Sequence, residues 1–172
     1  MAGRQPRETR NLDTYGNPPL EWERVRRALE QTVSGESITW FLGVTGPDGT
    51  PHAAGVGAVW VDDQAYLVSG PGTRKSRDLA RQPAASLSVH LPDLDLVFEG
   101  TARRVTDAPT LERLVRVYNA TGWPAEVEGD ALTGPFSAPS AGPPPWYLYR
   151  LELGSVYAVA GAEPHGATRW RF

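Results

Sequence analysis

Residues 38–61 read ITWFLGVTGPDGTPHAAGVGAVWV. Every second residue from Ile38 to Val44 is large and apolar, which is the period of a strand with one buried face. The Gly-Pro-Asp-Gly sequence at 46–49 is typical of a tight turn, and a second strand is predicted from His52 to Val61. This stretch therefore predicts two neighbouring antiparallel strands.

The same strand period recurs along the rest of the chain. Further strands are predicted at residues 65–69, 85–91, 96–105, 147–153 and 155–160. Helices are predicted from Pro19, over residues 73–81 and from about residue 106. The aromatic end, residues 167–172, predicts an edge strand or a contact with a partner. Strands joined mostly by tight turns favour a mainly β fold with flanking helices, in which an antiparallel sheet closes into a barrel.

The predicted domain organisation is simple. Residues 1–18 are expected to be a flexible N-terminal segment, and residues 19–172 a single domain. From Thr121 to Pro145 the chain is rich in Gly, Pro, Ala and Ser, which predicts a long irregular connection. Connections of this length are commonly functional or disordered, and Trp123 and Phe136 indicate that this one is partly packed.

The composition excludes several classes of protein. The 172 residues include no Cys, so there is no disulfide framework, Cys-ligated metal or Cys nucleophile. A formal net charge of −3 argues against a dedicated nucleic-acid binder. No apolar run approaches the roughly 18–20 residues that span a membrane, and the polar N-terminus predicts a cytoplasmic protein. The three His residues lack metal-ligand spacing, so no metal site is predicted.

The clearest candidate site is the Ser-Gly-Pro-Gly-Thr-Arg-Lys-Ser-Arg stretch at 69–77. It combines a strand end, a Gly-rich turn and a helix start that carries three cations, among them Lys75, the only lysine of the chain. Amide groups at a helix start and nearby cations favour a bound anion such as a phosphate. The alternative is a solvated basic turn whose cations pair with Asp78 or another carboxylate.

The strand predicted at 52–61 is unusually rich in small residues, including Gly55, Gly57 and Ala58. Such a strand offers a wall that a flat ring system can approach closely. The alternative is tight sheet packing around Trp40 or Trp60.

The order of these features resembles the split β-barrel flavin and deazaflavin oxidoreductases, the superfamily that includes pyridoxamine 5′-phosphate oxidase. The resemblance covers about Glu21 to Val105. It is carried by Trp-Phe-Leu-Gly-Val at 40–44, Pro-Asp-Gly-Thr-Pro-His at 47–52, Thr-Arg-Lys-Ser-Arg-Asp-Leu at 73–79 and Phe-Glu-Gly-Thr-Ala at 98–102. The last two segments look particularly like the branch that binds the deazaflavin coenzyme F420.

The resemblance implies a split β-barrel of the antiparallel Greek-key type, and a homodimer that holds its cofactor, F420 or FMN, between the protomers. The phosphate would lie on Thr73, Arg74, Lys75 and Arg77. The ring would lie along the second and third strands, near Val56, Ala58, Trp60 and Ser69. Trp170 lies near the C-terminus and would approach the ring from the other protomer.

The resemblance also bears on activity. Pyridoxamine phosphate oxidases carry basic residues along the second strand, where this chain has small and apolar ones, so a relative with another substrate is predicted. The expected reaction is hydride transfer between F420 and a small conjugated organic substrate, with an FMN-dependent, pyridoxamine 5′-phosphate oxidase-like oxidoreductase as the alternative. Because the cofactor carries such chemistry, no catalytic residue is predicted. A non-catalytic carrier of flavin or haem is the second alternative.

Overall fold

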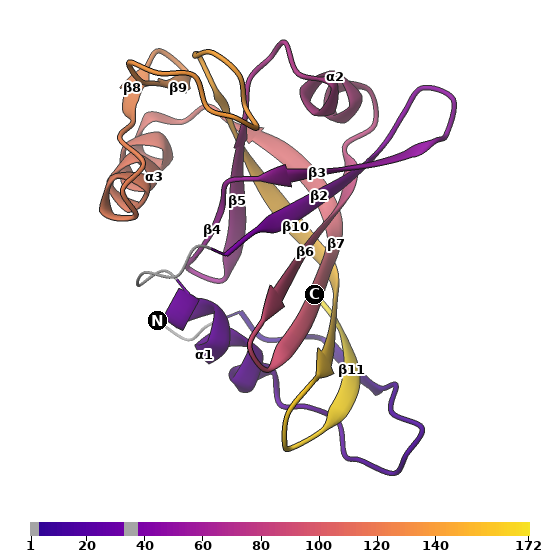
Figure 1. Ribbon diagram of the computed structural model, residues 1–172. Helices are drawn as coiled ribbons and strands as arrows, with labels where there is room; N and C mark the ends of the chain where they lie inside the picture. Colours follow the sequence, from indigo (N-terminus) through magenta and orange to yellow (C-terminus); the bar gives the residue numbers. More distant parts are fainter. Residues whose placement is uncertain (1–3, 33–37) are drawn as a thin grey trace.

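The computed structural model describes residues 4–32 and 38–172, which form a mainly antiparallel β structure with three helices (Figure 1). The helices are α1 (Trp22–Thr32), α2 (Arg74–Arg81) and α3 (Ala108–Ala120). The strands are β1 (Glu8–Asn11), β2 (Trp40–Thr45), β3 (Pro51–Val56), β4 (Ala58–Val61), β5 (Gln64–Ser69), β6 (Ala84–Leu91), β7 (Leu94–Val105), β8 (Glu126–Glu128), β9 (Ala131–Thr133), β10 (Tyr147–Ala160) and β11 (Gly166–Arg171). No helix of this described part is long and apolar enough to cross a membrane.

The predicted first hairpin is confirmed. Strands β2 and β3 pair antiparallel from Trp40 opposite Val56 to Thr45 opposite Pro51. Trp40, Leu42 and Val44 are buried, as their spacing requires. Gly49 has a φ of +81°, so the turn uses a backbone conformation that glycine adopts at low cost.

The single strand predicted at 52–61 is two strands in the structure, and Gly57 lies between them. Strand β3 stays with β2, whereas β4 pairs with β5. Strand β5 pairs in turn with β10, and the sheet continues through β7 and β6 back to β2. Strands β3 and β4 are joined by the chain at Gly57 and do not pair with each other, so this connection completes the barrel at the point where strand pairing is interrupted. This arrangement is a split β-barrel, which confirms the predicted fold class.

Two other predicted boundaries are corrected. The strands expected at 147–153 and 155–160 are one strand, β10, with an irregularity between Leu153 and Ser155. A bulge bends a strand without ending it, so β10 pairs with β5 and β7 in the barrel and continues beyond it beside β11. The long connection 121–145 is not wholly irregular, since it contains the small β8–β9 hairpin.

The N-terminal segment is ordered where it meets the C-terminus. Residues 8–11, expected to be flexible, form β1 and pair with β11 from Glu8 opposite Arg171 to Asn11 opposite Thr168. Strand β11 is thus covered on both sides, by β10 and β1, and is not the predicted edge strand. Only the tertiary structure brings these two chain ends together.

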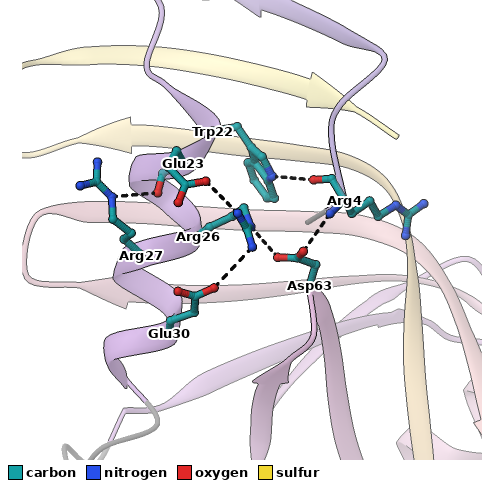
Figure 2. Close-up of polar contacts among 7 residues, drawn as sticks. All are labelled: Arg4, Trp22, Glu23, Arg26, Arg27, Glu30 and Asp63. Atoms are coloured by element: carbon teal, nitrogen blue, oxygen red, sulfur yellow. Dashed lines mark hydrogen bonds and ion pairs between the residues drawn. The ribbon is translucent and has the colours of Figure 1, made fainter. Parts of the chain in front are cut away.

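The turn between β4 and β5 is clamped to α1 and to the N-terminal segment, as Figure 2 shows. Asp63 accepts hydrogen bonds from Arg26 Nε at 2.7 Å and from the backbone N–H of Arg4 at 2.8 Å. The carbonyl of Arg4 accepts a hydrogen bond from Trp22 Nε1 at 3.1 Å. Both Asp62 and Asp63 have positive φ, a conformation that Asp and Asn tolerate better than most residues. These contacts, which we call the clamp, fix the end of β4, a strand that lines the cavity described below.

We expect Asp63→Asn to lower the free energy of unfolding by about 2 kcal/mol, because an amide can accept only one of the two bonds and turns its NH₂ group toward the other donor. Asp62→Asn is the matched control, since that side chain is 68% exposed against 10% for Asp63. Urea unfolding followed by circular dichroism measures both variants. Equal losses of unfolding free energy in the two variants would show that the hydrogen bonds of Asp63 contribute no more to stability than the exposed contact of Asp62.

Candidate functional site

The start of α2 carries a cluster of three hydroxyl groups, from Ser69, Thr73 and Ser76. Thr73 is the N-cap and accepts a hydrogen bond from the backbone N–H of Ser76 at 3.2 Å. Ser69 Oγ lies 2.8 Å from Thr73 Oγ1 and 2.8 Å from Ser76 Oγ. The end of β5 and the first turn of α2 are thereby joined into one polar site.

Lys75 lies in the first turn of the same helix and is buried, with 6% of its surface exposed. Its Nζ donates to the backbone carbonyl oxygen of Ser140, and burial lowers the pKa of Lys75 below its ordinary value. Among the residues that the structure describes, no carboxylate forms an ion pair with it. A buried ammonium is normally paired with an anion, so this site has a cation whose counter-charge the described chain does not provide.

The neighbouring arginines behave differently. Arg74 and Arg81 both pair with the buried carboxylate of Asp78, at 3.5 and 2.9 Å. Arg77 is exposed and donates to the carbonyl oxygen of Gly72 at 2.6 Å. The alternative of a basic turn paired with Asp78 therefore describes Arg74. It does not describe Lys75, which lies two residues from the helix cap and contacts the connection 121–145 instead.

A cavity of about 280 Å³ lies next to this polar site. Small residues form part of its wall, namely Gly57, Ala58, Ala138 and Ala141, and aromatic residues form another part, namely Trp40, Trp60, Tyr118 and Trp123. Ser140, which accepts the hydrogen bond from Lys75, also lines the cavity. Lys75 and the three hydroxyl residues do not line the cavity themselves, so Ser140 lies between the buried cation and the cavity. A cation next to an aromatic cavity suits a ligand with an anionic group and a flat apolar part.

The residues predicted for a ring fall into two groups. Ala58 and Trp60 line the cavity, and Ser69 belongs to the hydroxyl cluster. Val56 is buried in the barrel core and is not among the cavity-lining residues. Trp60 also packs on Phe98, with ring centroids 5.5 Å apart, so the alternative of tight core packing holds for that side of its ring.

Trp170 lies away from the candidate site. It is 1% exposed, and its ring packs on Trp22 at 5.3 Å in the core of its own chain. Core packing is the role that the structure shows for Trp170, and its approach to a ring held by the other protomer stays a prediction.

Sequence reasoning missed the walls contributed by distant segments. The cavity is closed by Tyr118, Thr121 and Trp123 at the end of α3 and by residues 138–141. Length and composition marked the connection 121–145 as a candidate functional segment. No local pattern shows that Ser140 meets Lys75, because the two are 65 residues apart in the chain.

Comparison with known proteins identifies the family of this chain. A family model described as pyridoxamine 5′-phosphate oxidase matches residues 25–141. The chain belongs to this family. No curated protein matches the chain. The matched residues of this family member include the barrel strands β2 to β7 and the whole of α2, and they end within the segment that covers Lys75.

Three solved structures of similar fold illustrate the range of such proteins. An FMN-binding protein of Nostoc punctiforme, related to pyridoxamine 5′-phosphate oxidase, has a TM-score of 0.56 and 13% identity over 85% of this chain and 87% of its own. An F420 reductase has a TM-score of 0.51 and 19% identity over 73% and 94%. A heme binding protein of Mycobacterium smegmatis has a TM-score of 0.58 and 16% identity over 82% and 55%. At these identities the likeness concerns the fold alone.

Proposed function

We propose that this family member is an oxidoreductase that binds a phosphate-bearing flavin or deazaflavin, with F420 favoured and FMN as the alternative. The observation that carries the proposal is the buried ammonium of Lys75, which has no described carboxylate partner and belongs to the helix start at which three hydroxyls cluster. A phosphate supplies the missing negative charge and accepts hydrogen bonds from these groups. Arg74 and Arg77 are exposed on the same helix and are proposed to approach the phosphate from the solvent side.

The cavity beside Lys75 is proposed to receive part of the ring system and the substrate. Gly57 and Ala58 offer little side chain to obstruct a flat ring, and Trp40, Trp60 and Trp123 supply aromatic surface. The bound cofactor supplies the hydride chemistry. The chain's own groups hold the phosphate, orient the ring and exclude water, and a small conjugated substrate fits the aromatic lining.

F420 is favoured over FMN by the Lys-Ser-Arg-Asp-Leu sequence at 75–79 and the Glu-Gly-Thr-Ala sequence at 99–102, which resemble the F420-binding branch. One similar structure is an F420 reductase and another is an FMN-binding protein, so both cofactors belong in the test. The deciding experiment titrates the purified protein with F420 and with FMN side by side, followed by cofactor fluorescence. We expect tighter binding of F420. Tighter binding of FMN would reverse the order, and no binding of either would overturn the proposal.

Turnover separates an enzyme from a carrier. Reduced F420 mixed with the protein and a panel of conjugated acceptors, such as quinones and unsaturated ketones, should be oxidised faster than without protein. Tight binding without turnover across the panel, or a haem absorption spectrum in the purified protein, would favour a carrier instead. A heme binding protein shares the fold, which makes the spectrum worth recording.

We also propose that the protein acts as a homodimer through the outer face of β2, β6 and β7. Phe41, Ser88 and Val97 lie directly opposite one another across these three strands, and Phe41 and Val97 are 50% and 36% exposed. Two exposed apolar side chains on either side of a small serine, on a sheet face, are suited to contact with a second copy of the same surface.

Phe41→Glu is expected to produce monomers, because it places a charge in the centre of the proposed contact. Size-exclusion chromatography with light scattering measures the mass, and cofactor titration measures whether the site depends on the dimer. Val159→Glu is the control, since Val159 is equally exposed but lies on the distant part of β10. A monomeric wild-type protein, or a dimer that survives Phe41→Glu, would contradict this interface.

A further inference from the structure

The groups proposed to hold a phosphate are covered in this structure. We call Ser69, Thr73, Lys75, Ser76 and the backbone N–H of Gly70 the anion cradle. Ser69 is 0% exposed, Ser76 4% and Lys75 6%. A phosphate must touch these atoms directly to accept their hydrogen bonds, since such bonds span about 3 Å between heavy atoms. Some part of the chain therefore has to move before an anion can enter.

Residues 138–142, which we call the strap, cover the cradle at Lys75 and at the backbone N–H of Gly70. The carbonyl oxygen of Ser140 accepts from Lys75 Nζ, and that of Ala141 accepts from the backbone N–H of Gly70 at 3.0 Å. In Figure 1 the connection between β9 and β10, drawn in orange, passes close to the end of β5 that leads to α2. The strap thus presents carbonyl oxygens where a phosphate would present its own oxygens.

A carbonyl is the weaker partner for these donors. The hydrogen bond from the Lys75 ammonium to the Ser140 carbonyl joins a charge to a neutral dipole, whereas a phosphate would add the direct attraction between opposite charges. The ammonium of Lys75 is buried against neutral groups, as its lowered pKa also indicates. The interaction of the Lys75 ammonium with an anion is therefore stronger than its interaction with the Ser140 carbonyl. This difference favours displacement of the strap by an anion.

The strap is built so that it can leave the cradle as a unit. Its turn is closed by two hydrogen bonds between Ala138 and Gly142, at 2.9 and 2.7 Å. Its base is held by Trp146 Nε1, which donates to the carbonyl oxygen of Gly142 at 2.9 Å. None of these bonds involves the cradle, so the turn and its anchor stay intact when the tip at Ser140 and Ala141 moves away.

The strap also forms a wall of the cavity, through Ala138, Ser140 and Ala141. We propose that the strap is a ligand-displaced gate: in the free protein its carbonyls occupy the anion cradle, and the phosphate of the incoming cofactor replaces them and opens the adjoining cavity. This inference rests on the proposed function and adds how access to that site is controlled. Because the closed strap prevents binding, the apparent affinity equals the intrinsic affinity multiplied by the fraction of molecules in which the strap is open.

Gly70→Ala tests the gate. A Cβ on Gly70 would lie 2.1 Å from the carbonyl oxygen of Ala141, so the substitution pushes the strap off the cradle. The same Cβ stands where a phosphate oxygen would replace that carbonyl, so this variant is read by exchange in the free protein and not by affinity. Gly72→Ala is the matched control in the same turn, because a Cβ there has no heavy atom within 4 Å. Hydrogen–deuterium exchange of peptides that cover residues 134–146, with and without FMN or F420, reports the state of the strap. Fluorescence titration reports the affinity of each protein for the same two cofactors.

We expect the bound cofactor to speed exchange in the strap of the wild-type protein and of Gly72→Ala. In Gly70→Ala, exchange in the strap should already be faster without cofactor than in Gly72→Ala. Slower or unchanged exchange in the wild-type strap on binding, or equal exchange in free Gly70→Ala and Gly72→Ala, would overturn the gate and leave the proposed function standing. Absence of binding by all three proteins would overturn both.

Discussion

Lys75→Ala should weaken the binding of F420 or FMN by roughly 100-fold, the largest loss expected from any single side chain in the site. Lys75 is the one buried cation of the anion cradle, and a hydrogen bond to a charged group contributes about 1.5–3 kcal/mol, with each 1.4 kcal/mol equal to tenfold in affinity. The fold should remain intact, because removing a buried charge that has no described counter-ion costs little stability. Fluorescence titration and thermal unfolding measure the two effects.

Two further variants separate charge from packing. Lys75→Met keeps most of the aliphatic chain and should bind as weakly as Lys75→Ala, whereas Arg81→Ala removes a cation from the far end of the same helix and should bind like the wild type. A small, equal effect in all three would show that the general charge of α2 attracts the cofactor and that Lys75 has no specific role.

The affinity for the cofactor should also depend on pH, in a direction set by the pKa of Lys75. Burial lowers the pKa of Lys75 in the free protein, whereas a bound phosphate would favour its charged form. Affinity should therefore be highest at pH values below the pKa of Lys75 in the free protein and should fall as the pH rises through it. Titrations between about pH 7 and pH 10.5, the upper limit being the ordinary lysine pKa, should show this fall in the wild type and not in Lys75→Met.

Gly100→Val should destabilise the barrel by about 4 kcal/mol or more, the largest stability effect expected from a single added side chain. A Cβ on Gly100 would lie 2.0 Å from the backbone carbonyl oxygen of Glu152. That oxygen belongs to β10 beside its irregularity at Leu153 and Ser155, where the strand pairs with β7 along most of its length. Because the obstacle is backbone within a sheet ladder, it cannot rotate away as a side chain could.

Soluble yield and urea unfolding of Gly100→Val test this expectation. Gly161→Val is the matched control, since a Cβ on Gly161 meets no heavy atom within 4 Å and the residue lies outside the barrel ladders. We expect Gly161→Val to unfold close to the wild type. Similar losses in the two variants would show that the close approach of β7 and β10 at Gly100 is not a tight constraint.

Local patterns in the sequence were sufficient for the elements whose burial depends on near neighbours. The period-2 pattern of residues 38–44 predicted the strand β2, in which Trp40, Leu42 and Val44 are buried. Thr73 and the Gly-rich turn predicted the helix start at the candidate anion site. Each of these depends on residues a few positions apart, where spacing alone decides which side chains share a face.

The remaining features depend on contacts between distant segments. The break at Gly57 arises because β3 and β4 pair with different strands, and β1 exists because β11 lies beside it. The local sequence likewise does not distinguish Arg74, which pairs with Asp78, from Lys75, which is buried under Ser140. Local patterns were thus enough to predict most of the barrel strands and the cationic helix start. Which cation is buried and which segment covers it depend on tertiary contacts, because burial is set by segments that meet only when the chain has folded.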